Sequence, residues 1–142
     1  CHWGVEKDNY PESYQLQLGK KCIDMGADLV IGHHPHVLQG IEEYKGKLII
    51  HSLGNFCFGA NRSPSDMDTM IFQQEFTFID GELSGDMVAK VIPCSISSVK
   101  NRNNFQPTPL TGEEAERVIN RLNTYSAVMG VTITEEGIVE KK

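Results

Sequence analysis

The residues of this chain best suited to chemistry are three histidines in the segment Gly32-His33-His34-Pro35-His36. Imidazole nitrogens are strong ligands for divalent transition metals, and three of them within four residues can converge on one site. Pro35 fixes the backbone between His34 and His36, so the two rings can splay and serve ions about 4 Å apart, as in two-metal hydrolytic sites. The alternative is a loop of surface histidines that caps a strand. We predict a metal site, with His33 as its weakest member.

Three further residues are candidates for the same site. His2 is either a ligand or an ordinary terminal residue, and Glu6 is either catalytic or a solvated carboxylate. Asn55 follows a strand-like run that ends in Gly54, at the sheet edge where α/β folds place ligands. The alternative for Asn55 is a structural turn, because asparagine tolerates a left-handed backbone. His51, within the strand-like run, is expected to be buried and structural.

The elements that must position these residues follow from hydrophobic periodicity. Apolar residues recur at spacings of three and four between Pro11 and Gly26, which predicts a helix. Its buried face should hold Tyr14, Leu18, Cys22 and Met25. The short apolar runs 29–31 and 48–53 predict buried strands, and each ends in a loop that carries candidate residues. A helix that feeds a buried strand indicates an α/β fold.

The second half of the chain is predicted to be less regular. Residues 70–79 and 87–92 read as strands of an antiparallel hairpin joined by the turn-rich segment 80–85, with Pro93 interrupting the pairing. Residues 95–109 should be irregular. A capping box at 111–114 should open an amphipathic helix that runs to Tyr125. The tail from Val131 is either a short edge strand or a frayed end.

Composition bounds the class of protein. A chain of 142 residues with 39% hydrophobic content is read as one domain, or the larger part of one. The net charge of −6, without a basic face, argues against a nucleic-acid partner. No apolar run approaches the ~20 residues of a membrane-spanning helix. We expect Cys22 and Cys57 to be small buried hydrophobes. We interpret the start at Cys1 as a cut through a domain.

Four motifs in order resemble the C-terminal half of the bacterial capsule synthesis proteins of the CapA type, which act in poly-γ-glutamate biosynthesis. The resemblance covers roughly residues 1–80, and nothing beyond about residue 95 is recognised. The motifs are His2-Trp3-Gly4-x-Glu6, Gly26-Ala27-Asp28-Leu29-Val30-Ile31-Gly32-His33-His34-Pro35-His36-Val37, Tyr44-Lys45-Gly46-Lys47 and Ser52-Leu53-Gly54-Asn55-Phe56.

The resemblance implies a fold that belongs with the calcineurin-like metallophosphoesterases. The chain would then be an α/β fold, part of an αββα sandwich with mixed β-sheets. Residues 1–95 would form the C-terminal half of that domain, and residues 96–142 would add a loop and a C-terminal helix that complete it. By the same resemblance, His2 stands at the histidine of a Gly-Asn-His-like segment. His34 and His36 match a Gly-His-x-His pair, in which His33 replaces the glycine.

The resemblance also implies chemistry and partners. The complete protein would hold two divalent ions (Mn, Fe, Zn or similar), with the remaining ligands supplied by a missing N-terminal half, and would hydrolyse a phosphoester. This piece alone would be inactive, and whether it holds a metal by itself is left open by the resemblance. The alternative is a non-hydrolytic envelope component that binds or exports an anionic capsule polymer, and a third is an inert module. The expected location is the extracellular face of the cell envelope, anchored through a missing segment. An open sheet edge would pair with the missing half or with a second copy.

Overall fold

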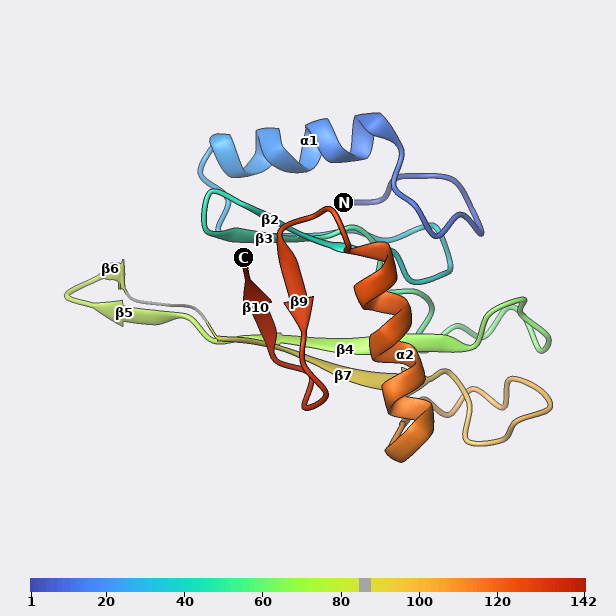
Figure 1. The fold of residues 1–142 in the computed structure, drawn as a ribbon. Coiled ribbons are helices and arrows are strands. Elements are labelled where there is room, and N and C mark those ends of the chain that lie inside the picture. The colour runs from blue at the N-terminus through green and yellow to red at the C-terminus, as the bar shows by residue number, and fades with distance from the viewer. Residues whose placement is uncertain (85–87) are drawn as a thin grey trace.

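The computed structural model describes residues 1–84 and 88–142, and Figure 1 shows a mixed α/β arrangement of short sheets with two helices. The elements in chain order are α1 (Ser13–Asp24), β1 (Leu29–Ile31), β2 (Ile41–Tyr44), β3 (Lys47–Ile50), β4 (Asp68–Gln74), β5 (Thr77–Ile79), β6 (Glu82–Ser84), β7 (Ala89–Ser95), β8 (Thr108–Pro109), α2 (Gly112–Tyr125), β9 (Val131–Ile133) and β10 (Val139–Lys141).

The first sheet has the strand order β1-β3-β2, with β1 parallel to β3 and β2 antiparallel to it. Helix α1 lies along one face of this sheet (Figure 1). On that face Ile49 packs in a cluster with Trp3, Ile23 and Val30. Both faces of the sheet are covered, which explains why residues 48–50 are apolar in succession instead of alternating.

The opposite face of the first sheet belongs to the main core. This cluster joins the first sheet to the second sheet (strand order β4-β7-β8), to α2 and to the β9–β10 hairpin. Its buried members are Leu38, Ile41, Leu48, Ile50, Met70, Ala89, Val91, Val118, Ile119, Leu122, Val131, Ile133 and Val139. Residues on both sides of position 95 therefore share one core.

Helix α1 forms where the periodicity predicts it, but the predicted buried face is wrong. Its buried residues are Gln15, Gly19 and Ile23, whereas Tyr14 and Leu18 are 49% and 42% exposed. The helix approaches the sheet through glycine: a Cβ at Gly19 would lie 2.9 Å from the Ile49 side chain. A close approach at a small residue therefore selects a face one position away from the apolar one. The last member of the predicted face, Met25, is 80% exposed, and Cys22 is partly buried.

The predicted antiparallel hairpin is confirmed, with two differences. Strand β4 pairs with β7, and the segment between them includes the small β5–β6 hairpin. The expectation that Pro93 interrupts the pairing is wrong, because Pro93 lies opposite Met70 within the ladder. Its carbonyl accepts from Leu110 on the β8 side, so its missing N–H also faces away from β4. The first residue of the predicted second strand, Met87, and the last of the connecting turn, Gly85, lie outside the described residues.

Residues 95–109 are not wholly irregular, because β8 pairs with the end of β7. Helix α2 is present, but the predicted capping box is wrong, since Thr111 makes no side-chain capping bond. The tail from Val131 pairs as β9 with β10, which decides between the two alternatives in favour of a strand. Cys57 is exposed, contrary to expectation, because its segment is a loop rather than a strand. In the described part of the chain, neither helix could cross a bilayer.

The α/β class is therefore confirmed, with small mixed and antiparallel sheets. The four-layer αββα sandwich and the division at residue 95 stay predictions.

Candidate metal centre

The histidine loop follows β1, and the first residues of the chain run parallel to its start. Trp3 N donates to His33 O (3.0 Å), and His33 N donates to Cys1 O (2.8 Å). Trp3 is 4% exposed and donates from Nε1 to His51 O at 2.8 Å. A Cβ at Gly32 would lie 2.2 Å from both Trp3 Nε1 and His51 O, so only glycine fits where the strand ends. This packing fixes the N-terminal segment against the loop.

The segment that carries Glu6 is held by backbone bonds and by buried glutamines. Lys7 N donates to Pro35 O at 2.7 Å, which ties this segment directly to the histidine loop. Gln39 is fully buried, and its Nε2 donates to Asp8 O (2.9 Å) and to Tyr10 O (3.2 Å). Its Oε1 accepts from Gln15 Nε2 of α1 at 3.1 Å. The position of Glu6 is therefore set by the core beneath it.

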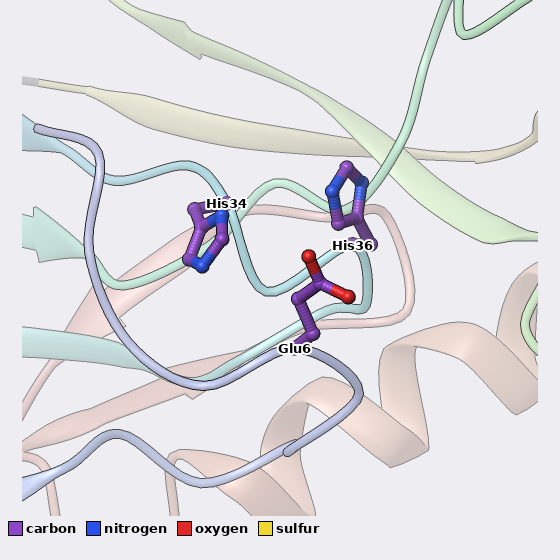
Figure 2. Close-up of side chains that lie close together, drawn as sticks. All are labelled: Glu6, His34 and His36. Carbon is purple, nitrogen blue, oxygen red and sulfur yellow. The ribbon is translucent and has the colours of Figure 1, made fainter. Parts of the chain in front are cut away.

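Glu6, His34 and His36 converge, with one potential ligand atom from each lying within 4.8 Å of the others. Figure 2 shows the Glu6 carboxylate directed toward the space between the two imidazoles. Across residues 1–84 and 88–142, no other three side chains of the His, Cys, Asp and Glu types converge in this way. Two imidazoles and one carboxylate are the donor set of open catalytic zinc sites and of non-haem iron sites. The residues therefore fit a divalent metal.

The backbone of the loop is strained where it presents these rings. His34 and His36 have φ angles of 101° and 61°, and Lys7, next to Glu6, has a φ of 66°. Side chains other than glycine avoid this left-handed region, at a cost of roughly 1–3 kcal/mol per residue. Strain of this kind persists where the surrounding structure enforces it, and it concentrates at functional sites.

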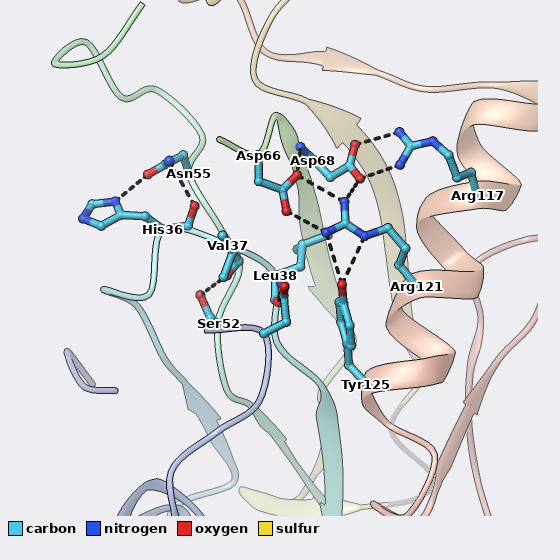
Figure 3. Close-up of polar contacts among 11 residues, drawn as sticks. His36, Val37, Leu38, Ser52, Asn55, Asp66, Asp68, Arg117, Arg121 and Tyr125 are labelled. Carbon is cyan, nitrogen blue, oxygen red and sulfur yellow. Dashed lines mark hydrogen bonds and ion pairs between the residues drawn. The ribbon is translucent and has the colours of Figure 1, made fainter. Parts of the chain in front are cut away.

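Asn55 orients one ring of the cluster rather than entering it. Its Nδ2 donates to His36 O (3.2 Å), so its Oδ1 faces His36 Nδ1 at 2.7 Å, as Figure 3 shows. Because that oxygen is an acceptor, the hydrogen-bond pattern assigns the proton of His36 to Nδ1. The lone pair of Nε2 is then available to a metal, which is the usual arrangement for a ligating histidine.

The two remaining candidate histidines flank the cluster. The His2 ring lies against that of His34, with centroids 4.3 Å apart, but it contributes no atom to the converging set. His33 is exposed and also lies outside that set. Desolvation lowers the pKa of His33, and the positive N-terminus and His2 lower it further. The structure thus brings His2 beside the cluster and leaves His33 at its edge.

The cluster opens into a pocket of about 260 Å³. One wall consists of the candidate histidines 2, 33, 34 and 36, and the other is the loop from Gly54 to Phe58. The ring of Phe58 packs on His36 with centroids 5.0 Å apart. A ligand at the cluster would therefore contact the 54–58 loop as well.

His51 lies outside the pocket, and its expected burial is confirmed. It is fully buried, and its Nε2 lies 3.0 Å from Glu42 Oε2. Burial raises the pKa of Glu42, but hydrogen bonds from His51 and Lys20 more than offset this effect and hold the pKa below its usual value. His51 therefore belongs to a buried polar contact of the core.

The sequence reasoning missed the residues that hold the site together. Trp3, Gln15 and Gln39 touch no ligand atom of the cluster, yet they fix the segment that carries Glu6. The sequence signal for these three residues was weak, because each lies within or beside an element whose pattern is dominated by its apolar residues.

Comparison with known proteins finds relatives of the region that carries this site. Residues 1–60 match the family described as "Bacterial capsule synthesis protein PGA_cap". The chain is 56% identical over 57 residues to "PGA biosynthesis protein CapA" of Bacillus subtilis (strain 168) and 54% identical over 57 residues to "Capsule biosynthesis protein CapA" of Bacillus anthracis. It is also 47% identical over 67 residues to "Uncharacterized protein y4sH" of Sinorhizobium fredii (strain NBRC 101917 / NGR234).

These matches cover 40% of this chain for each Bacillus protein and 47% for the Sinorhizobium protein. They span only 14 to 15% of the relatives' own length. Every candidate residue of the site lies within the matched region. The resemblance drawn from the four motifs is therefore confirmed over residues 1–60, which match the bacterial capsule synthesis protein family.

Proposed function

We propose that this chain is part of a cell-envelope protein of capsule biosynthesis that binds divalent metal at Glu6, His34 and His36 and, in its complete form, hydrolyses a phosphoester. The observation that carries the proposal is the convergence of these three side chains within 4.8 Å. The family of residues 1–60 supports the capsule part of it.

The residues of this chain would have different roles at the site. His36 would bind through Nε2, held by Asn55, while His34 and Glu6 would complete one side of the coordination sphere. A bound divalent ion would polarise a phosphoryl oxygen and make a bound water more acidic. The pocket wall at residues 54–58 would contact the rest of the substrate and limit the access of water.

A second metal and its ligands belong to the same proposal. His2 lies beside His34, with ring centroids 4.3 Å apart, and would supply a further imidazole. The other ligands would come from the N-terminal half of the domain, which would pack against this chain. We place the assembled protein at the extracellular face of the envelope, anchored through a segment N-terminal to this chain. Its substrate would be an anionic phosphoester or capsule polymer.

The proposal is tested by metal content and phosphodiesterase activity of the full-length protein. The variant His34→Ala, His36→Ala should lose metal affinity by at least roughly 100-fold and lose hydrolysis with it. Asn55→Ala should weaken metal binding by about tenfold, because His36 loses its orienting partner. His33→Ala is the matched control and should change neither quantity, since His33 lies outside the converging set. Equal metal content and activity in the double variant would contradict the proposal.

A second candidate function is supported by the relatives' names, which refer to biosynthesis and not to hydrolysis. In this alternative the protein binds or exports an anionic polymer without turnover. Capsule formation that the double variant restores in full to a deletion strain would favour it.

A further inference from the structure

We infer that Arg62 and Arg102 form a second, anion-binding site beside the metal pocket, which takes a carboxylate or phosphate group. The two arginines line a hollow of about 210 Å³ together with Asn103, Asn104 and Phe105. Among the residues that the structure describes, no carboxylate lines this hollow, although acidic residues outnumber basic ones 19 to 13 in the chain as a whole.

The two guanidinium groups are available to a ligand. Both arginines are exposed, and in residues 1–84 and 88–142 neither side chain forms a hydrogen bond or an ion pair. By contrast, the other two arginines, Arg117 and Arg121, are both paired with aspartate. Unpaired guanidinium groups offer planar sets of donors that match the geometry of carboxylate and phosphate.

The backbone beneath the two arginines is fixed, which lowers the entropy cost of binding. Asn103 N donates to Arg62 O (2.8 Å), and Ser97 Oγ donates to Arg102 O (2.8 Å). The side chain of Asn103 is 2% exposed and donates to Phe58 O (3.2 Å) and Asn61 O (3.0 Å). Two loops more than 40 residues apart in sequence are thus joined at the base of the hollow.

The same junction connects the hollow to the metal pocket. Phe58, whose carbonyl accepts a hydrogen bond from Asn103, lines that pocket and packs against His36. Figure 1 shows the loop before β4 (green) and the loop after β7 (gold) at the same end of the molecule as the loop that follows β1. An extended anionic ligand could occupy both the metal pocket and the hollow. This link between the two sites rests on the proposed function, whereas anion binding by the hollow does not.

The charge of the molecule makes the hollow selective. A net charge of −6 repels anions in general, so an anion is held only where cations gather without acidic neighbours. Lys100, in the same loop as Arg102, is also exposed and adds to the positive field. Phe105 supplies an apolar wall for the carbon chain that carries the anionic group.

The test is calorimetric titration of this chain with hexaglutamate and, separately, with tripolyphosphate. The variant Arg62→Gln, Arg102→Gln should bind at least one probe roughly tenfold more weakly than the unmodified chain, because charge-assisted hydrogen bonds are lost. Binding of one probe only would identify the anionic group, and binding of both would show that the site accepts either. A chelating resin removes metal from the protein before the titration and leaves no free chelator in the buffer, so a failure of the proposed metal site leaves this result unaffected.

The matched control is Lys21→Gln, Lys90→Gln, which removes the same charge from lysines in α1 and β7. It should retain the affinity of the unmodified chain. Both double variants should melt at the same temperature as that chain, since none of the four side chains has a hydrogen-bond partner among the described residues. Equal weakening in the two double variants would show non-specific attraction and overturn the proposal, as would absence of binding to both probes.

Discussion

Two polar clusters lie at the same end of the molecule and differ in how their groups are satisfied. In the metal pocket, Glu6, His34 and His36 direct potential ligand atoms toward one another across open space. In the second cluster, Arg117 and Arg121 of α2 surround Asp68 at the start of β4 (Figure 3). Among the described residues, no hydrogen bond or ion pair joins the three side chains of the first cluster to one another, whereas ion pairs join those of the second.

The aspartate cluster is held together by ion pairs and hydrogen bonds among its own side chains. Arg117 donates to both oxygens of Asp68, at 2.7 and 2.8 Å, in a bidentate pair. Arg121 donates to Asp68 as well, and binds Asp66 at 2.6 Å and the Tyr125 hydroxyl at 3.2 Å. Every charged group there has a partner of opposite sign, so the cluster docks α2 onto the second sheet.

The difference separates a binding role from a structural one. A closed cluster contributes to stability and has no donor or acceptor left for a ligand. An open cluster on a strained backbone costs stability, and binding of a ligand offsets that cost. Substitutions in the two clusters should therefore have opposite effects on folding, and the predictions below run from the largest expected change to the smallest.

The largest change should follow Asp68→Ala. Asp68 has a side chain only 7% exposed, so its removal leaves Arg117 and Arg121 without their shared partner at a partly buried site. The free energy of unfolding should fall by about 3 kcal/mol. Urea denaturation followed by circular dichroism measures this change.

The control is Glu114→Ala, in which Arg117 loses only a partner that is 52% exposed. That substitution should cost about 0.5 kcal/mol or less. If both variants lose the same stability, the cluster is a set of surface ion pairs and the contrast with the metal pocket fails.

The aspartate cluster also shows why part of the structure could not be predicted from the sequence. Its ion pairs join residues 49 to 55 positions apart, and no local pattern brings β4 and α2 together. The face of α1 was misjudged for a related reason. Tyr14 and Leu18 have the spacing of a buried stripe, but Gly19 and Gln15 determine which side can approach the sheet.

The metal pocket was easier to predict from the sequence, because its loop follows a local sequence pattern. A short apolar strand that ends in Gly32 and delivers several histidines predicts both the loop and its donors. Glu6 was predicted as a catalytic candidate for the same site, and the structure groups it with His34 and His36 as a potential metal ligand. No local pattern indicates this convergence, since it depends on the bond from Lys7 N to Pro35 O and on the buried Gln39. Asn55 was predicted as a site residue, and the structure gives it an orienting role beside His36.

A smaller change should follow acidification. Burial raises the pKa of Asp68, but the hydrogen bonds and charge of Arg117, together with Arg121, more than offset this effect and hold the pKa below its usual value. Between that lowered pKa and about 4, the unfolded chain binds more protons than the folded one. The contribution of Asp68 to stability is therefore present above about pH 4 and is lost as the pH falls through the folded-state pKa.

Urea midpoints measured from pH 5 downward test this expectation. Glu42 adds a slope of the same sign, because its pKa is also lowered. The difference between the unmodified chain and Asp68→Asn isolates the aspartate cluster. Parallel pH profiles for these two proteins would show that the arginine partners of Asp68 add no pH-dependent stability.

The smallest change, and the one of opposite sign, should follow His34→Gly. His34 has a φ of 101°, which glycine adopts without strain, so the metal-free chain should gain up to about 1 kcal/mol of stability. His34→Ala is the matched control, since alanine also removes the imidazole but keeps the Cβ that opposes this backbone. Thermal or urea unfolding of both variants without metal measures the difference. A glycine variant no more stable than the alanine variant would mean that the loop stores no strain at His34. The pocket would then resemble the aspartate cluster in having an unstrained backbone.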